Sequence, residues 1–445
     1  MDFTEQILSK LGFTLTPMQE AASEVVGSRH NAVLLSPTGS GKTLAYLLPI
    51  CRNLNAEAQH LQAVVIVPSR ELAQQCDDVF RSLKTPLRSM CLHGGRPAMN
   101  EHRTLREVKP HIVFATPGRL LDHLTKENIL GVTVRVLVVD EFDKCLELGF
   151  LEEMENVVRR MPRVEQCVLT SATDAEEIPA FISVFEQGKA GSAIRLDFLD
   201  NAAELSRRQD FRIVPSPRKD KLETLAHLLS SLKDGLAMVF VLHRESADRV
   251  GKYLSGEGFS VETYHGGMEQ EYRERALSKF RSGCSNILVA TDLAARGLDI
   301  PEVRAVVHYH PAADADAFVH RNGRTARWDA GGSIYLIMNE AEELPDYVPA
   351  DAEVCDVEQV AIRPMKPRWA AVYVGRGKKD KLSRMDIVGF FCKKGGLRAE
   401  EIGRIELGAH YACVAVLRSK MTAVLKAVAG EKIKGMKTLI EPMRR

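Results

Sequence analysis

The 445-residue chain is long enough for about three domains, and its 45% hydrophobic and 27% charged residues are typical of globular proteins. This composition excludes collagen-like, mucin-like and fully disordered chains, and no apolar run approaches the ~18 residues that cross a bilayer. The net charge of +1 hides an uneven distribution, because residues 366–445 hold 19 basic and 7 acidic residues while the rest holds 41 and 52.

Short apolar runs alternate with helical patterns in the first part of the chain. Runs that are apolar throughout predict strands buried on both faces, and their alternation with helices predicts a doubly wound parallel sheet. The predicted strands are 32–36, 63–68, 89–93, 111–115, 134–140 and 166–171. The predicted helices between them include 42–54, 70–83 and 118–124.

A glycine-rich segment between the first strand and the first helix predicts a phosphate-binding loop. Its glycines let backbone N–H groups turn toward phosphate oxygens, next to the positive end of a helix dipole. We expect Lys42 to reach the β- and γ-phosphates and Thr43 to ligate Mg²⁺. Ser36 stands where the generic pattern has its first glycine. The predicted binding residues are Thr38, Gly39, Ser40, Gly41, Lys42 and Thr43.

Two acids, Asp140 and Glu141, close the fifth predicted strand. The carboxyl end of such a strand faces the ligand crevice of an open α/β sheet. We expect Asp140 to hold Mg²⁺ and Glu141 to orient or deprotonate an attacking water. Acids also occur at ordinary helix N-termini, but the phosphate loop upstream favours the catalytic interpretation.

A second series of the same kind begins after residue 208, and the polar segment 197–208 is the expected hinge. The series predicts a second α/β domain of similar size. Its predicted strands are 237–243, 260–264, 286–290, 304–309 and 333–338. Its predicted helices include 245–254 and 270–280.

The segment 320–327 of this second domain contains four cations in eight residues. Such a density is costly unless an anion lies near, and the second domain has no phosphate loop of its own. We therefore expect these arginines to meet a γ-phosphate held by the first domain, as arginine fingers. A solvated basic helix start is the alternative.

The last part of the chain reads differently. Residues 340–359 hold eight acids and no Lys or Arg, and we expect a terminal strand followed by an interdomain linker there. Beyond it the pattern is β-α-β-β-α-β, the split ferredoxin-like arrangement of RRM modules. A net charge of +12 on this module favours a nucleic-acid partner over a merely solvated face. The predicted elements are strand 370–374, a helix from Ser383, strands 402–407 and 411–417, helix 419–430 and strand 438–442.

The nine cysteines are scattered and odd in number, with no Cys-x-x-Cys pair. This disfavours a disulfide framework and a zinc site, and it predicts a reducing, cytoplasmic location. The first residues have neither a basic nor an apolar stretch, so we expect no secretory signal.

These motifs, in this order, resemble those of the DEAD-box family of RNA helicases over nearly the whole chain. The segment 12–19 is similar to the Q motif, which in the family recognises adenine, and residues 140–143, Asp-Glu-Phe-Asp, are similar to the motif that names the family. The resemblance implies two RecA-like doubly wound parallel-sheet domains, with ATP and Mg²⁺ as cofactors, followed by the small α+β RRM-like (ferredoxin-like) domain.

The resemblance also implies roles for individual residues. Phe13, Gln19 and Asp299 would complete the ATP site, with Arg324 and Arg327 as the arginine fingers. Asp143, Ser171 and Thr173 would couple hydrolysis to unwinding. The implied RNA contacts of the two large domains are Arg70, Gly94, Gly95, Thr116, Gly118, Arg119, Gly266 and Thr291.

The basic tail resembles the C-terminal RNA-binding domain of DbpA-type bacterial helicases, which implies anchoring to a hairpin of large-subunit ribosomal RNA during ribosome assembly. Tyr373 and Tyr411 either stack on bases or pack in the core. The expected phosphate contacts are Lys378, Lys379, Lys381, Lys432, Lys434 and Lys437.

Several positions depart from the family pattern. Phe142 replaces the usual alanine between Glu141 and Asp143, and Asn322 replaces an aliphatic residue. Ser36, Ser69 and Ala326 replace the usual Ala, Thr and Gly. We expect hydrolysis to survive, and we predict that Phe142 alters the coupling between hydrolysis and unwinding.

The sequence thus predicts an RNA-dependent ATPase and non-processive RNA helicase that acts on ribosomal RNA as a monomer, in transient contact with pre-ribosomal particles, away from membranes and without zinc. An ATP-gated RNA clamp, a general RNA chaperone, a DNA helicase and a protein remodeller are the alternatives. The predicted divisions are 1–205, 206–345, a linker 346–367, and 368–445.

Overall fold

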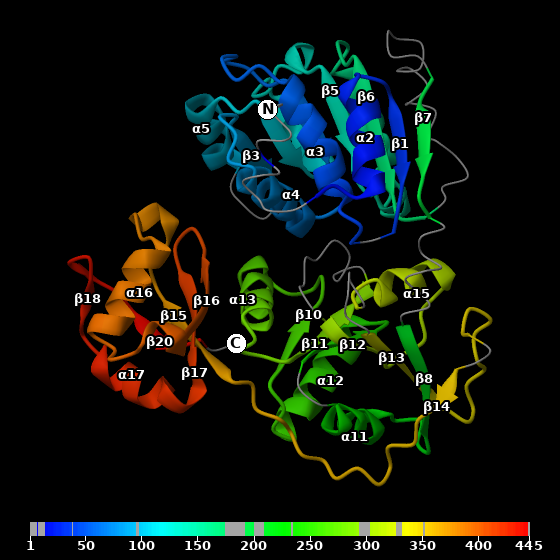
Figure 1. Ribbon diagram of the computed structural model, residues 1–445, viewed down its shortest axis with the longest axis vertical. Coiled ribbons are helices and arrows are strands. Elements are labelled where there is room, and N and C mark those ends of the chain that lie inside the picture. The colour runs from blue at the N-terminus through cyan, green and yellow to red at the C-terminus, as the bar shows by residue number, and fades with distance from the viewer. Residues whose placement is uncertain are drawn as a thin grey trace. The chain divides into compact units, whose positions relative to one another are not determined.

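A computed structural model of the chain divides into two compact units, which meet in sequence at residues 207 and 208 and are described one at a time. Figure 1 shows their helices and strands. Within the described residues no helix is both long and apolar enough to span a membrane. The described residues are 7, 14–37, 39–94, 98–173, 192–199, 209–232, 235–292, 303–325, 332–349 and 352–443.

The first unit is built on a seven-stranded sheet whose strand pairs are all parallel. The strand order is β3-β4-β2-β5-β6-β1-β7. This confirms the predicted doubly wound fold. The strands are β1 (Ala32–Leu35), β2 (Ala63–Ile66), β3 (Ser89–Leu92), β4 (Ile112–Ala115), β5 (Val136–Val139), β6 (Gln166–Ser171) and β7 (Ile194–Asp197).

Alternate side chains of each central strand enter two different cores, one on each face of the sheet. Val64 and Ile66 pack in one core, whereas Ala63 and Val65 pack in the other. Burial on both faces explains why these strands are continuous apolar runs. The helices are α2 (Pro17–Gly27), α3 (Lys42–Asn53), α4 (Arg70–Ser82), α5 (Ala98–Val108), α6 (Pro117–Thr125), α7 (Phe142–Glu147) and α8 (Leu151–Arg159).

The second unit contains another all-parallel seven-stranded sheet, with the order β10-β11-β9-β12-β13-β8-β14. Helices α11 (Leu222–Ser231), α12 (Arg244–Gly256), α13 (Gln270–Arg281) and α15 (Ala315–Asn322) connect its strands. The strands are β8 (Gln209–Ser216), β9 (Leu236–Val241), β10 (Val261–Tyr264), β11 (Ile287–Thr291), β12 (Val303–His308), β13 (Gly332–Asn339) and β14 (Glu353–Val354).

The segment predicted as a linker is partly folded onto this second sheet. Strand β14 pairs with β8, and the Val357 side chain beyond it is only 2% exposed within the core. Further along, the Arg363 backbone N–H donates to the Ser230 hydroxyl at 3.0 Å. The connection to the tail is therefore a strap along the second domain rather than a loose chain.

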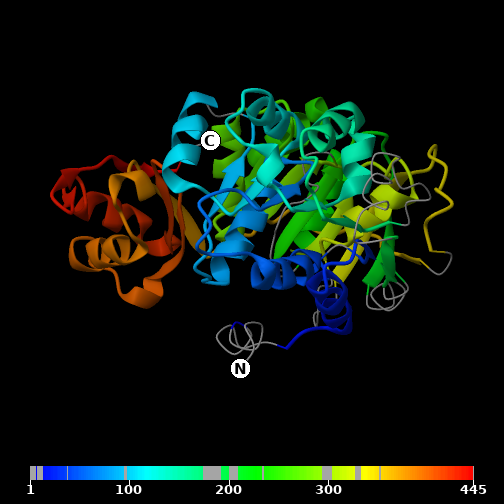
Figure 2. The same ribbon diagram turned by 90° about the horizontal axis from the view of Figure 1, so that it is seen from above.

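The tail forms the predicted β-α-β-β-α-β domain. Its four strands pair antiparallel in the order β16-β17-β15-β20, and helices α16 (Arg384–Lys393) and α17 (Met421–Ala427) cover one face (Figures 1 and 2). Ser383 caps α16 as predicted, within a capping box that includes Asp386. The remaining strands are β15 (Trp369–Val374), β16 (Ile402–Leu407), β17 (Ala412–Leu417), β20 (Ile440–Pro442) and the hairpin β18 (Lys432–Ile433) and β19 (Met436–Lys437).

Candidate functional site

The phosphate loop turns on two glycines with left-handed backbones. Gly39 has φ 80° and Gly41 has φ 90°, a region that favours glycine. Lys42 begins α3, is 8% exposed, and donates from Nζ to the carbonyls of Ser36 and, at 3.0 Å, Pro37. The ammonium is thus held inside the loop on backbone oxygens, which phosphate oxygens can replace.

The structure brings Gln19 against this loop. Gln19 lies in α2, and its amide nitrogen donates to the Gly41 carbonyl at 3.4 Å. A Cβ at Gly41 would collide with that nitrogen. The Gln19 Oε1 accepts from the Thr16 backbone N–H at 3.0 Å, which fixes the amide's orientation. The Q-motif glutamine and the phosphate loop therefore form one site.

Asp140 and Glu141 follow β5 at the same edge of the sheet. Asp140 is 3% exposed, and it accepts hydrogen bonds from the hydroxyls of Tyr46 and Thr170. Glu141 has φ 52°, a left-handed conformation that costs a non-glycine residue about 1–3 kcal/mol. Six other described non-glycine residues share this conformation, so the backbone angle alone assigns no role to Glu141.

The three predicted coupling residues lie together. The Thr173 hydroxyl donates to Asp143 Oδ2 at 3.1 Å, and the Thr173 backbone N–H donates to the Ser171 hydroxyl at 3.0 Å. Phe142 does not prevent this contact, because its side chain turns into the apolar core and is 2% exposed.

The motifs all follow the carboxyl ends of strands in the first sheet, and the strand order determines which motifs are neighbours. The phosphate loop follows β1, the coupling segment ends β6, and the two acids follow β5. The expected RNA motifs follow β2, β4 and β3, the other half of the same sheet. Ligands of open α/β sheets bind at the carboxyl ends of strands, so nucleotide and RNA would share this edge.

Two of the expected RNA-contacting residues touch within that second half. Arg70 begins α4, and its guanidinium lies about 3.0 Å from where a Cβ on Gly94 would stand, so the absence of a side chain allows the approach. Thr116 precedes α6, and Gly118 has open space around it. Arg119 pairs with Glu101 at 3.3 Å.

In the second unit, Gly266 follows strand β10 and Thr291 is the last residue of strand β11. These two strands are neighbours in the sheet. Gly266 is exposed with open space around it, and Thr291 is 9% exposed. Arg324 follows α15 and is 5% exposed.

Arg321, within the basic segment, is held by partners inside its own domain. Arg321 is 1% exposed and binds Asp292 with both ends of its guanidinium, at 2.5 and 2.7 Å. It also donates to His308 Nδ1 at 3.1 Å. The other His308 nitrogen, Nε2, pairs with Asn322 at 2.9 Å, which explains why an amide replaces an aliphatic residue there. Sequence reasoning missed this cluster, since its members are far apart in the chain.

Five predicted site residues lie outside the described residues. They are Phe13, Thr38, Gly95, Asp299 and Arg327.

The tail's sheet face is packed rather than open. The Tyr373 and Tyr411 rings stack with centroids 5.8 Å apart, and the Arg275 guanidinium of α13 lies 5.1 Å from the Tyr373 centroid. Arg418 of the tail donates to the Cys284 carbonyl of the second RecA-like domain at 3.3 Å. The two tyrosines are thus partly buried and contact each other and α13 within the unit.

Lysines predicted to contact phosphate lie elsewhere on the tail. Lys378, Lys379 and Lys432 are exposed. Lys434, in the hairpin turn, is also exposed but pairs with Asp386 at 3.0 Å. An exposed pair of this kind is weak and can exchange for a phosphate.

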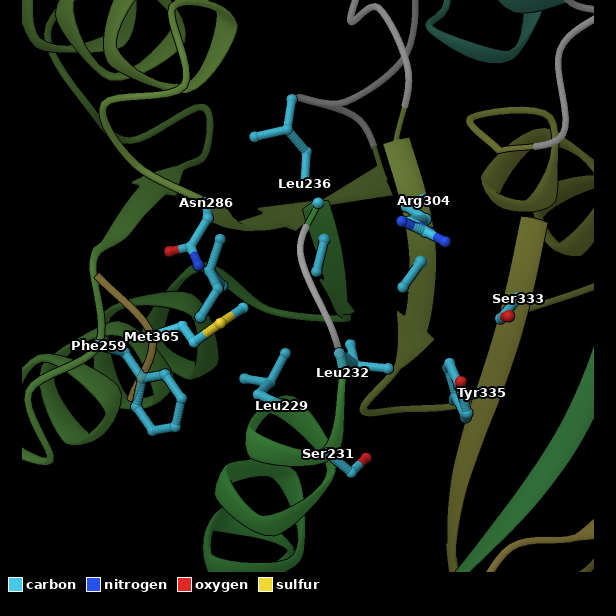
Figure 3. A pocket seen from close by; sticks show the side chains of 14 residues that line it. Leu229, Ser231, Leu232, Leu236, Phe259, Asn286, Arg304, Ser333, Tyr335 and Met365 are labelled. Atoms are coloured by element: carbon cyan, nitrogen blue, oxygen red, sulfur yellow. The ribbon is translucent and has the colours of Figure 1, made fainter. Parts of the chain in front are cut away.

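A cavity of about 230 Å³ in the second unit lies at the amino-terminal ends of the strands of its sheet (Figure 3). Leu236, Arg304 and Ser333, at the amino-terminal ends of three strands, line it. Because ligands of such sheets bind at the carboxyl ends, this cavity is separate from the candidate site.

Family models match three successive parts of the chain. Residues 16–181 match the DEAD/DEAH box helicase model, residues 220–329 the helicase conserved C-terminal domain, and residues 371–442 the DbpA RNA binding domain. The chain belongs to the DEAD-box family of ATP-dependent RNA helicases. It is an ATP-hydrolysing RNA helicase of the DbpA type, with a dedicated RNA-binding domain.

Relatives match over nearly the full length. The ATP-dependent RNA helicase DbpA of Escherichia coli (strain K12) is 33% identical, covering 96% of this chain and 94% of the relative. The DbpA of Bacillus subtilis (strain 168) is 28% identical, with 96% and 95% covered. A structure of Mss116p bound to single-stranded RNA and AMP-PNP superimposes with TM-score 0.69 at 26% identity, covering 76% of this chain and 73% of that one.

Proposed function

We propose that this helicase separates short stretches of structured RNA non-processively, and that its target is RNA of the large ribosomal subunit during ribosome assembly. The observation that carries the proposal is the tail: a +12 module that matches the DbpA RNA binding domain and is strapped to the second domain. Backbone-directed RNA binding in the two large domains would leave the choice of RNA to this module.

The first domain would hold ATP between Gln19 and the phosphate loop. Gln19 is oriented by Thr16 and would read adenine, while Lys42 would leave its backbone carbonyls for the β- and γ-phosphates. Glu141 would orient the attacking water and accept its proton.

The donor set at this edge fits Mg²⁺. Asp140 offers a buried carboxylate and Thr43 a hydroxyl at the start of α3, and Mg²⁺ prefers one or two carboxylates together with substrate phosphates. When bound, the ion would polarise the phosphoryl oxygens. Asp140 would hold it through an orientation set by its own hydrogen bonds.

Arg324 and Arg327 would supply positive charge to the transferred phosphoryl group from the second domain. Arg321, by contrast, pairs with Asp292 and would keep a structural role within the second domain. Closure around ATP and single-stranded RNA would bend the strand, and a bent strand cannot stay in an A-form duplex.

The tail would bind RNA through its basic loops rather than its sheet. Packing of Tyr373 and Tyr411 against α13 supports this, as does the exposure of Lys378, Lys379 and Lys432. The chain would act as a monomer in transient contact with pre-ribosomal particles. All nine cysteines are thiols, consistent with a cytoplasmic location.

A strand-displacement assay tests the helicase activity. A short RNA duplex with a single-stranded extension should be separated with ATP and not with AMP-PNP. Tight binding of RNA and ATP without displacement would support the RNA clamp instead.

Crosslinking the protein to RNA in cells, followed by sequencing of the attached RNA, tests the target. We expect one hairpin of large-subunit ribosomal RNA to dominate in the full chain and to be lost when residues after 366 are removed. Dispersed messenger RNA in both cases would support a general RNA chaperone.

A further inference from the structure

Both oxygens of the Asp140 carboxylate are held by hydroxyl groups. The Tyr46 hydroxyl donates to Oδ2 at 2.8 Å, and the Thr170 hydroxyl donates to Oδ1. In addition, the Cys76 Sγ atom lies 3.8 Å from Asp140 Oδ2. The donors come from α3, β6 and α4, three elements that meet at the end of β5.

Neither hydroxyl is needed to fill space. Tyr46 and Thr170 are each 0% exposed, where phenylalanine and valine would occupy nearly the same volume without a polar atom. A buried hydroxyl is costly unless it is hydrogen-bonded, and here the Asp140 carboxylate is the partner.

The Thr170 hydroxyl also links the two neighbouring acids. It donates to Asp140 and accepts from the Glu141 backbone N–H at 3.3 Å. Glu141 has a left-handed backbone, with φ 52°. One hydroxyl thus fixes the rotamer of the first acid and the strained backbone of the second.

We propose that Tyr46 and Thr170 are positioning residues that orient the Asp140 carboxylate for the magnesium–nucleotide complex. The inference rests on the proposed metal-binding role of Asp140. Hydrogen bonds to a ligating carboxylate restrict its rotation, and removing such outer partners typically weakens metal binding roughly 10–100-fold. Neither residue need touch the nucleotide for this effect.

The test measures magnesium affinity rather than turnover. Fluorescent ATP analogue binding to the full chain is titrated with Mg²⁺ for Tyr46→Phe, Thr170→Val and Thr170→Ser. We expect the Mg²⁺ midpoint to rise roughly 10-fold in Tyr46→Phe and Thr170→Val. Binding in EDTA should match the parent chain, and Thr170→Ser should restore the midpoint because it keeps the hydroxyl.

A matched control separates positioning from general loosening of the fold. Thr224 is a buried threonine of α11 whose hydroxyl bonds to Ser216 at 2.9 Å, in the second unit. Thr224→Val should leave the Mg²⁺ midpoint where the parent has it. A shift equal to that of Thr170→Val would mean that lost stability explains the effect, and it would overturn the positioning role.

The outcomes also separate this inference from the proposed function. If the parent's nucleotide binding does not respond to Mg²⁺, the proposed role of Asp140 fails. If the parent responds but Tyr46→Phe and Thr170→Val keep its midpoint, only the positioning role is overturned. Should Thr170→Val not fold, Tyr46→Phe, which removes a single oxygen atom, decides alone.

Discussion

The two seven-stranded sheets have the same topology but carry different side chains at the carboxyl ends of their strands. Numbered from the first strand of each sheet, both run 3-4-2-5-6-1-7. The first sheet carries the phosphate loop after its first strand and two acids after its fifth. The second carries neither, although the frame that would position them is present.

The clearest contrast is between two buried lysines that follow the first strand of each sheet. Lys42 Nζ lies on carbonyls of its own loop. Lys221, at the start of α11, donates to the Ile337 carbonyl at 2.7 Å and pairs with Glu342 at 2.5 Å. Lys221 thus has a carboxylate partner within its own domain, whereas Lys42 lies on backbone carbonyls of the predicted phosphate loop. A shared backbone frame can therefore serve either catalysis or structure, depending on which anion meets the lysine.

The largest expected effect comes from removing an acid that the first sheet has and the second lacks. Glu141→Gln should lower ATP turnover roughly 10²–10⁴-fold, the contribution of a positioned proton acceptor. Nucleotide and RNA affinity should remain, because the amide keeps the shape. Steady-state ATPase and equilibrium binding measure the two effects, and parental turnover would contradict the role of Glu141.

Phe142 is the next feature specific to the first sheet. Phe142→Ala should lower the free energy of unfolding by about 3–5 kcal/mol, because it leaves a cavity in a packed core. In the folded fraction, RNA stimulation of the ATPase should change more than the basal rate. ATPase with and without RNA tests this below the melting temperature, and equal changes in both rates would refute the coupling hypothesis.

Exchanging each lysine for methionine tests the contrast between them. Lys221→Met should lower the free energy of unfolding of the second unit by about 1–3 kcal/mol, since Glu342 and two carbonyls lose their donor. Lys42→Met should weaken nucleotide binding and leave that unfolding transition unchanged. Both tryptophans belong to the second unit, so tryptophan fluorescence follows it selectively. Weakened nucleotide binding in both variants would contradict the division of roles between Lys42 and Lys221.

A pH-dependent effect is expected at the final residue of each fifth strand, which is Val139 in the first sheet and His308 in the second. Burial lowers the pKa of His308 to about 3, with the Arg321 charge adding to the effect. The unfolded chain takes up this proton below about pH 6.5. The second unit should therefore lose stability on acidification between those values, by about 1.4 kcal/mol per pH unit.

His308→Gln should flatten this dependence in urea titrations followed by tryptophan fluorescence. His310, whose pKa burial lowers to about 4, remains as a second and smaller source of acid sensitivity. The same slope in the parent and the variant would show that His308 does not contribute.

The sequence predicted the central strands well because burial on both faces leaves continuous apolar runs. It missed β7, whose side chains are mostly exposed, and β8, which mixes charged residues and a proline with apolar ones. A terminal strand was expected within residues 340–359, and the two-residue β14 lies there, although it is too short for its bounds to show in the pattern. These strands lie at or near one edge of their sheets, where two-sided burial no longer imposes its pattern.

The candidate site was predictable where its residues form local motifs. Lys42 and Asp140 stand in recognisable segments, and the structure places both at one sheet edge. The hydroxyls around Asp140 were not predictable, because Tyr46 lies 94 residues away in the chain and only the fold brings it there. The pairing of Arg321 with Asp292 was missed for the same reason.

The strap between the second domain and the tail has a consequence for kinetics. A flexible linker would let the second domain and the tail sample many separations, which lowers the effective concentration of one at the other. Here β14 and Val357 pack on the second domain, so only a short segment between Val357 and the tail remains to act as a linker. If the tail captures RNA as proposed, the second domain would meet that RNA at a high effective concentration, and a long glycine–serine insertion near residue 365 should lower this concentration.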